Sequence, residues 1–362
     1  MTAGRAIAFG LVSGGLGGGQ RIALAVAREL VTRGFSISVL SPSPGESVER
    51  FRELGATIYI SGPLRSYDLT RMWRLCRFLC REGVSCVYTH SVPAHEIVFG
   101  VAALSARSRL VVHRHILGHL SSSSLVHRYQ LLMWRFVLRR ADAVICVSSQ
   151  VREQLDQLET DSYLVPNGVP VPAGQESPRD KGEIQVGFIG RMDPNKRLED
   201  FIAAARDIRD EVQTVRFVVV GGGEGTEYEN ECLRLVEQLG LTSHFSFLRE
   251  ARDAREVMAE LDILVLPSIL EGHPLVLLEA MANSKAVVAT DIPGNRETIT
   301  DRVHGRLVPT RAPEEIAAAV IELARSPELR EEWGRAARAK VKERFTEERM
   351  VDELVRIVIG EG

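Results

Sequence analysis

The sequence predicts an α/β protein built from two doubly wound parallel-sheet domains. Short apolar runs of strand length alternate with helical stretches along the whole chain. A glycine-rich turn follows the first run, and the same pattern starts again near residue 184 after a stretch of linker composition. With 362 residues the chain is also too long for one typical core. Two domains are therefore expected.

The first half opens with a β-α-β unit. Ile7–Val12 has the pattern of a buried strand, Ser13–Gly19 of the turn after it, Ile22–Leu30 of a helix and Phe35–Leu40 of the next strand. Further strands are predicted at Thr57–Ile60, Cys86–Thr89, Leu110–Val112, Ala143–Val147 and Ser162–Val165. We assign residues 1–172 to this domain.

The second half repeats this order after a linker at residues 173–183, which is rich in proline and glycine. Strands are predicted at Ile184–Ile189, Arg216–Val220, Phe245–Leu248, Ile263–Leu266, Ala286–Ala289 and Gly305–Val308. Helices are predicted at Leu198–Ile208, Tyr228–Leu239, Ala254–Glu260, Pro274–Asn283 and Glu314–Ala324. The second domain is expected over residues 184–344.

A final amphipathic helix, Phe345–Ile359, is expected within residues 345–362. It either packs on its own domain or crosses back to the first one, and the sequence leaves both open. Two facing doubly wound domains are expected to bind a ligand in a cleft, at the carboxyl ends of their strands.

Composition excludes several classes of protein. Residues 1–180 carry 20 basic and 14 acidic side chains, and residues 181–362 carry 25 and 34, an asymmetry too mild for a nucleic-acid protein. The five cysteines show neither a zinc spacing nor a disulfide pattern, which predicts reduced thiols and a cytoplasmic protein. We expect no signal peptide and no membrane-spanning helix.

The glycine-rich turn of the first half fits neither common nucleotide motif. When Gly15 and Gly17 are aligned with the first two glycines of G-x-G-x-x-G, Gln20 stands where the third glycine should be. Aligned with a P-loop, Gly14–Gly19 is followed by Gln20-Arg21 instead of Lys-Ser or Lys-Thr. The alternatives left are a loop whose bare backbone approaches a bound group and a tight turn without a ligand. The same alternatives apply to Gly221–Gly225.

The stretch Glu271–Ala282 is the strongest candidate site. Glu271 lies in a strand-to-helix loop, and Pro274 stands in the first turn of the helix, where its missing N–H costs nothing. The amides of Gly272, His273 and Leu275 precede or begin this helix, where an anion is favoured. Glu279 lies about one and a half turns further on. The alternative for each glutamate is an ordinary loop acid or a solvated helix face.

Cations and histidines complete the candidate set. Arg191 follows Gly190 at the exit of the strand Ile184–Ile189, and Lys196 comes five residues later. A guanidinium and an ammonium together suit a diphosphate. Arg197 is the alternative to Lys196. His113 lies at the end of a strand in the first half, where a histidine can accept a proton or bind a sugar hydroxyl, and His90 and His115 compete for this role. The alternative for each is a satisfied buried imidazole.

Taken together, these segments resemble retaining glycosyltransferases of family 4, which have the GT-B architecture of two facing Rossmann-like domains. The resemblance spans nearly the whole chain, and the order and spacing of its pieces make it specific. The matching segments are Gly14-Gly15, Val144–Ser148, Val165–Val169, Val186–Arg191 with Lys196, Val220–Gly223, Glu271–Pro274 with Glu279–Ala282, and Ile292–Glu297. The chain departs from the family at His273, where phenylalanine is commoner.

The resemblance implies that the second domain holds a nucleotide-sugar donor, such as a UDP- or GDP-sugar, and the first an acceptor. Arg191 and Lys196 would neutralise the donor diphosphate. Glu271 would contact hydroxyls of the transferred sugar, and Glu279 the ribose. Amides from Gly272 to Leu275 would hold phosphate or sugar oxygens. On the first domain, Gly15 and its neighbours would approach the phosphates, and His113 the sugar.

The implied reaction needs no separate cofactor. Neither half contains a D-x-D metal motif, so we expect the cations and the helix N-terminus to stabilise the leaving diphosphate. The family likeness implies retention of the anomeric configuration. A nucleotide-sugar epimerase or hydrolase, or a non-catalytic nucleotide-sugar-binding protein, are the alternatives.

A further expectation concerns the membrane. Residues 125–140 form a predicted helix that is apolar on most sides and ends in arginines, including Arg135, Arg139 and Arg140. Such a helix could dock on the anionic cytoplasmic face of a membrane and bring the first domain near a lipid-linked acceptor. A buried core helix with a basic end is the alternative. No nucleic-acid partner is expected.

Overall fold

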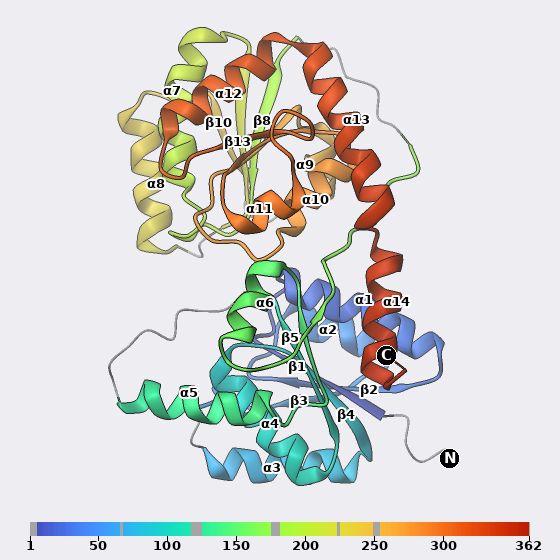
Figure 1. Cartoon of the computed structure of the whole chain (residues 1–362). Coiled ribbons are helices and arrows are strands. Elements are labelled where there is room, and N and C mark those ends of the chain that lie inside the picture. Colours follow the sequence, from blue (N-terminus) through green and yellow to red (C-terminus); the bar gives the residue numbers. More distant parts are fainter. Residues whose placement is uncertain are drawn as a thin grey trace. The chain divides into compact units, whose positions relative to one another are not determined.

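The structure is a computed structural model that describes residues 6–65, 68–116, 125–174, 182–222, 225–248 and 254–361 (Figure 1). Most of the predicted linker and two residues of the turn Gly221–Gly225 lie outside these ranges. The chain forms two compact units. Unit 1 comprises Met1–Asn167 with Glu348–Gly362, and unit 2 comprises Gly168–Glu347. Each is considered by itself.

Unit 1 is built on a seven-stranded parallel sheet in the order β3-β2-β1-β4-β5-β6-β7. The chain therefore starts in the middle of the sheet and reverses direction between β1 and β4, the switch point where doubly wound sheets bind ligands. Its strands are β1 Ala6–Leu11, β2 Ser36–Ser41, β3 Thr57–Ile60, β4 Val84–His90, β5 Arg109–Arg114, β6 Ala143–Cys146 and β7 Tyr163–Leu164.

Helices cover both faces of this sheet. On one face α4 lies between α3 and α5 and buries its apolar residues almost all round (Figure 1). Helix α14 packs near α1, where Arg33 pairs with Asp352 at 3.3 Å, and Arg109 of β5 donates to the carbonyl of Val358 at 3.0 Å. The helices are α1 Gly18–Thr32, α2 Glu46–Glu53, α3 Leu69–Arg81, α4 Pro93–Ala106, α5 Leu125–Leu138, α6 Ser149–Asp156 and α14 Glu347–Ile359.

Unit 2 repeats this topology with six parallel strands in the order β10-β9-β8-β11-β12-β13. Its switch point lies between β8 and β11. The strands are β8 Ile184–Ile189, β9 Val215–Val220, β10 Phe245–Leu248, β11 Ile263–Leu266, β12 Ala286–Thr290 and β13 Arg306–Val308. Two parallel doubly wound sheets confirm the predicted fold class.

The helices of unit 2 form two layers. Helices α7, α8 and α12 enclose one core with the sheet, and α9, α10 and α13 enclose the other (Figure 1). They are α7 Leu198–Glu211, α8 Glu227–Gln238, α9 Ala254–Glu260, α10 Leu275–Ala282, α11 Pro293–Thr298, α12 Pro313–Arg325 and α13 Pro327–Arg344.

The structure contains helix α13, which the sequence analysis did not predict. It is rich in charged residues, and its buried positions include Gly334 and Ala337, which carry little apolar signal. A Cβ on Gly334 would lie only 2.1 Å from the carbonyl oxygen of Ser284, so the helix packs there through bare backbone. Arg338 is 7% exposed and donates to the carbonyls of Pro172, Gly174 and Ala282, which ties the start of unit 2 to the end of α10.

Candidate functional site

The candidate site in unit 2 lies at the carboxyl ends of β8 and β11, two neighbouring strands at the switch point. Strand β8 leads directly to Gly190 and Arg191, and β11 leads to the loop of Glu271. The two loops are joined by the amide of Ile269, which donates to the carbonyl of Asn195 at 2.9 Å. The topology therefore brings together the two segments that the sequence analysis selected.

Lys196 and Glu271 form an ion pair across these loops. The Lys196 Nζ lies 2.6 Å from Glu271 Oε1, and their side chains are 21% and 6% exposed. A carboxylate buried to this degree requires a partner, because an unpaired charge away from water is costly. The pair places one cation and one hydrogen-bond acceptor beside the start of α10.

Arg191 occupies a different position. Its side chain is 82% exposed, and its nearest acidic partner is Asp193, at 3.4 Å. The amide of Asn195 donates to Asp193 Oδ1 at 3.0 Å, which closes the turn between the two cations. The structure thus brings Lys196 to Glu271 and leaves the Arg191 guanidinium in solvent. Arg197, the alternative to Lys196, pairs with Glu199 and Asp200 at the start of α7.

Close backbone packing supports the loop of Glu271. A Cβ on Gly294 of α11 would lie 2.5 Å from the carbonyl oxygen of Glu271 and 2.7 Å from that of Gly272. Gly221, at φ +116°, packs in the same way against the carbonyl oxygen of Gly190, whose amide donates to Val220 at 2.9 Å. Gly294 belongs to the Ile292–Glu297 segment, but the sequence analysis gave it no place in the site, because a glycine shows no contact until the chain is folded.

Helix α10 begins one residue later than predicted, at Leu275, with Pro274 as its N-cap. The first amides of a helix have no acceptor within it, so this end favours an anion. Glu279 is half-buried on the second turn. His273 is 4% exposed and its ring lies 5.1 Å from that of Phe345. Burial, with Lys340 nearby, lowers the pKa of His273 to about 3, so the ring is neutral at pH 7.

In unit 1 the glycine turn leads directly into α1. A Cβ on Gly14 would lie 2.2 Å from the carbonyl oxygen of Pro44, so tight packing explains this glycine. Gly15 is exposed and a Cβ there would meet Ser13 Oγ at 3.7 Å, which is ordinary contact. Gly17 is the N-cap of α1. The backbone of Gly15 is therefore accessible, as are the exposed Gly17 and Gly18 at the start of α1.

His113 does not stand alone at the sheet edge. Its side chain is 1% exposed, its Nδ1 lies 2.8 Å from the hydroxyl of Tyr88, and the rings of His90 and His115 pack against it. Burial lowers the pKa of His90 and His113 well below the ordinary value, and burial with Arg114 lowers the pKa of His115 to about 3. The three competitors for one role are therefore one cluster of neutral imidazoles.

The sequence contained the signal for this cluster. His90 is the last residue of β4, His113 is next to last in the neighbouring strand β5, and His115 directly follows that strand. Residues two apart on a strand share a face, and parallel neighbours end at the same edge. The sequence analysis weighed these histidines one by one and missed their association.

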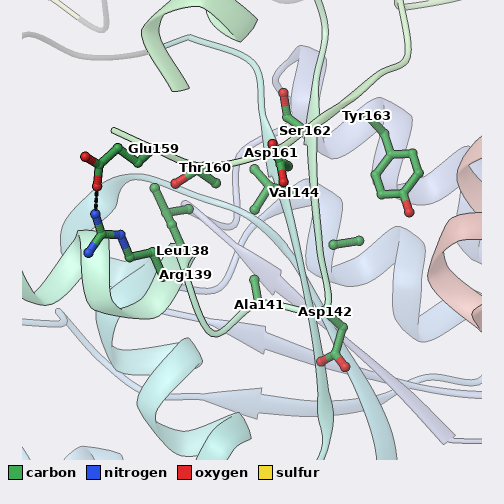
Figure 2. A pocket seen from close by; sticks show the side chains of 11 residues that line it. Leu138, Arg139, Ala141, Asp142, Val144, Glu159, Thr160, Asp161, Ser162 and Tyr163 are labelled. Carbon is green, nitrogen blue, oxygen red and sulfur yellow. Dashed lines mark hydrogen bonds and ion pairs between the residues drawn. The ribbon is translucent and has the colours of Figure 1, made fainter. Parts of the chain in front are cut away.

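A pocket of about 380 Å³ lies elsewhere in unit 1 and is lined by the residues that lead into β6 and β7 (Figure 2). Figure 2 shows Arg139 and Glu159 paired at one side and Asp142 at the other. It lies at the amino ends of these strands, opposite to the edge where such sheets bind ligands. It contains none of the predicted site residues.

Two family models match the chain over nearly its whole length. "Glycosyltransferase Family 4" matches residues 16–171, and "Glycosyl transferases group 1" matches residues 173–340. The chain belongs to glycosyltransferase family 4. This glycosyltransferase is 27% identical to the phosphatidyl-myo-inositol mannosyltransferase of Mycobacterium tuberculosis, over 96% of this chain and 94% of that protein. It is 26% identical to an uncharacterized glycosyltransferase of Methanocaldococcus jannaschii, over 70% of this chain and 69% of that protein.

Other relatives are matched over shorter stretches. The mannosyltransferase of Mycolicibacterium smegmatis is 34% identical, but the match spans 51% of this chain and 49% of that protein.

Among solved structures, HepE of Anabaena in complex with UDP and glucose superposes with a TM-score of 0.84 at 20% identity, over 98% of this glycosyltransferase and 99% of that chain. Sucrose-phosphate synthase of Thermosynechococcus elongatus gives 0.78 at 20% identity, over 98% of both. These neighbours confirm the GT-B fold.

The described residues include no helix with the length and apolarity that crossing a bilayer requires.

Proposed function

We propose that the enzyme transfers a sugar from a nucleotide-diphosphate sugar to a hydroxyl acceptor, with retention of the anomeric configuration. The observation that carries this proposal is the partly buried ion pair between Lys196 and Glu271, held beside the N-terminus of α10 at the switch point of unit 2. One cation, one carboxylate and a set of free helix amides suit a ligand that joins a diphosphate to a hydroxyl-rich ring. The solved neighbours that hold UDP or UDP-glucose support a donor of this class.

In this proposal unit 2 binds the donor. Lys196 and the amides from Gly272 to Leu275 hold the diphosphate, Glu271 accepts hydrogen bonds from sugar hydroxyls, and Glu279 accepts them from the ribose. Lys196 can contact a phosphate while it still holds Glu271, because an ammonium has three donors. Arg191 is able to swing from solvent onto the phosphates, since its side chain is 82% exposed and its ion pair with Asp193 is at 3.4 Å.

The reaction proposed is a same-face substitution. The bond between the anomeric carbon and the diphosphate oxygen breaks, and its electron pair passes to the diphosphate. The acceptor hydroxyl forms the new bond to the anomeric carbon and gives its proton to the departing phosphate. Negative charge grows on the diphosphate in the transition state, so Arg191, Lys196 and the helix N-terminus accelerate the step by stabilising it. No metal ion acts on the diphosphate in this scheme.

We assign the carboxyl edge of the unit 1 sheet to substrate binding as well, through the backbone of Gly15 and Gly17 and through the histidine cluster. His113 is the residue that the family resemblance selects. Since its ring is buried and His115 is half-buried, we assign direct contact with substrate to His115 and the support of that ring to His113.

The acceptor we propose is attached to a lipid, because α5 presents an apolar surface next to basic residues. Its buried side, with Trp134 and Val137, packs in the core, whereas Leu132 is 67% and Phe136 43% exposed. The guanidinium of Arg140 lies 5.0 Å from the Phe136 ring. Arg135 and Arg139 both pair with Glu159, so Arg140 carries the charge next to the apolar patch. Such a surface suits the interface of an anionic membrane.

A thermal-shift screen of UDP- and GDP-sugars, followed by turnover with candidate acceptors, tests the donor. A donor at 100 times its Kd should stabilise the protein by about 2.7 kcal/mol, which raises its Tm. Lys196→Ala should lose most of this rise in Tm, whereas Lys342→Ala, on the exposed surface of α13, should keep it. An equal shift in Lys196→Ala would remove the diphosphate assignment. Hydrolysis or epimerisation of the donor without an acceptor would replace transfer as the reaction.

Flotation with anionic liposomes tests the membrane surface. Phe136→Ser with Arg140→Ser should lower the bound fraction, and Val303→Ser, an equally exposed apolar residue of unit 2, should leave it unchanged. Binding that persists in the double variant would place the membrane contact elsewhere.

A further inference from the structure

The histidine cluster of unit 1 has the composition of a metal site. His90, His113 and His115 each offer one ring nitrogen, and the three nitrogens all lie within 4.8 Å of one another. The rings face each other with centroid distances of 4.3 Å for His113 and His115, 4.9 Å for His90 and His113, and 5.2 Å for His90 and His115. Three imidazoles, from the ends of two adjacent strands and the residue after one of them, thus lie in one small cluster.

The hydrogen bonding of the cluster is incomplete. His90 Nδ1 lies 3.0 Å from His115 Nε2, and His113 Nδ1 lies 2.8 Å from the Tyr88 hydroxyl. The Nε2 atoms of His90 and His113 are buried and have no hydrogen-bond partner within the part of the chain that the structure describes. His90 and His113 are 3% and 1% exposed. A buried polar atom without a partner is costly, so two of them in one cluster call for a ligand.

The spacing fits a tetrahedral ion after a small movement. With metal–nitrogen bonds of about 2.0–2.1 Å, two ligands of a tetrahedral ion stand roughly 3.4 Å apart. Nitrogens within 4.8 Å of each other therefore need to close by at most about 1.4 Å, which ring rotation can supply. Imidazole nitrogen suits zinc, copper and nickel and does not suit magnesium or calcium, which take oxygen ligands.

The surroundings hold the rings in place. The Tyr88 hydroxyl occupies His113 Nδ1 and leaves Nε2 of that ring available as a ligand, and a contact of this kind orients a ligating histidine. Arg114, between His113 and His115, is 2% exposed and donates to the carbonyls of Ser91 and Ile116, the residues after His90 and His115. Its guanidinium therefore fixes both strand exits that carry the ligands.

We propose that His90, His113 and His115 form a binding site for a divalent cation of the zinc type. Three neutral ligands leave the fourth position of a tetrahedral ion for water or an oxygen of a bound molecule. The sequence predicted no bound metal because neither half has a D-x-D motif and the cysteines show no zinc spacing, and this site uses neither pattern. The proposal rests on the geometry of unit 1 and does not require sugar transfer, although it uses His113 and His115, which the proposed function assigns to substrate binding.

The test is titration of the tag-free, chelator-treated full-length protein with Co²⁺, followed by visible absorption. We expect the ligand-field bands of tetrahedral Co²⁺, one equivalent at saturation, and displacement by Zn²⁺. His115→Ala should weaken Co²⁺ binding by at least about 100-fold, and Tyr88→Phe, which removes an outer contact, by about 10–100-fold. His244→Ala, in unit 2 and outside the cluster, should bind as the wild type does.

Of the three histidines, His115 is the one whose replacement by alanine should disturb folding least, because its ring is half-buried. Circular dichroism should show that His115→Ala keeps the native spectrum. A sulfur-to-cobalt charge-transfer band would assign the ion to thiols such as Cys76 and Cys80 and would overturn the proposal. The same holds if the wild type binds no stoichiometric Co²⁺, or if folded His115→Ala binds it equally well.

Discussion

The carboxyl edges of the two sheets have the same topology and opposite chemistry. In unit 2, Lys196 and Glu271 pair beside an exposed Arg191, so charge is available to a ligand. In unit 1, the charges of Glu96 and Arg114 are buried against each other at 2.8 Å, and neutral imidazoles occupy the edge. The strand order determines where a site forms, and the burial of each side chain determines what it can bind.

The buried pair of unit 1 gives the largest predicted effect. Glu96 is 0% exposed and accepts from Arg114 and from the indole of Trp134, at 2.8 and 2.7 Å. Glu96→Ala leaves the Arg114 guanidinium buried without its counter-ion and should lower the free energy of unfolding of unit 1 by about 3–5 kcal/mol. Chemical denaturation measures this.

The matched control is Glu49→Ala, which removes an ion pair with Arg52 whose side chains are both more than half exposed. It should change stability by less than about 0.5 kcal/mol. Equal effects of the two variants would contradict the contrast between buried and exposed charge.

Arg191 should show the reverse behaviour, with a large effect on activity and little on stability. Because it acts on charge that develops in the transition state, Arg191→Ala should reduce kcat by about 10²–10³-fold. Thermal unfolding should be unchanged, since the side chain is 82% exposed. Arg206→Ala, an exposed arginine of α7 paired with Asp207, is the control. Near-normal turnover in Arg191→Ala would contradict this role and would assign stabilisation of the leaving diphosphate to Lys196 and the N-terminus of α10.

Glu279 tests the nucleotide end of the proposed donor site. Glu279→Ala should weaken donor binding by about 1.5–3 kcal/mol, the value of hydrogen bonds to a charged group. Calorimetry with the nucleotide diphosphate alone isolates this contact from the sugar. Glu297→Ala, on nearby α11, should bind as the wild type does. Unchanged affinity in Glu279→Ala would exclude the ribose role.

His273 gives a different kind of effect, a pH dependence of stability. Its pKa is lowered from 6.5 to about 3 in the folded protein, so the unfolded chain binds the proton first as the pH falls. Its contribution to stability is complete above pH 6.5 and is lost by roughly 1.4 kcal/mol per pH unit as the pH falls towards 3. Denaturation at pH 7 and pH 5, with hydrogen exchange to follow unit 2, should show a shallower loss in His273→Phe. An unchanged slope would show that the imidazole is not held neutral.

Much of the fold could be predicted from the sequence because it depends on local patterns. Within the described residues, apolar runs of strand length marked all thirteen strands, and most of these runs are apolar because the inner strands are covered on both faces. Helix α13 was not predicted because its buried positions include a glycine, an alanine and an arginine besides Trp333 and Val341. The glycine and the arginine become informative only next to Ser284 and Pro172.

The candidate site divides in the same way. The positions of Arg191, Lys196, Glu271 and Glu279 followed from the sequence, because the carboxyl end of a strand in a parallel sheet can be recognised from the pattern alone. The ion pair of Lys196 with Glu271, the exposure of Arg191 and the association of three histidines were decided by the tertiary structure. Each depends on which strands become neighbours and which side chains lose water, and those distances do not exist until the chain has folded.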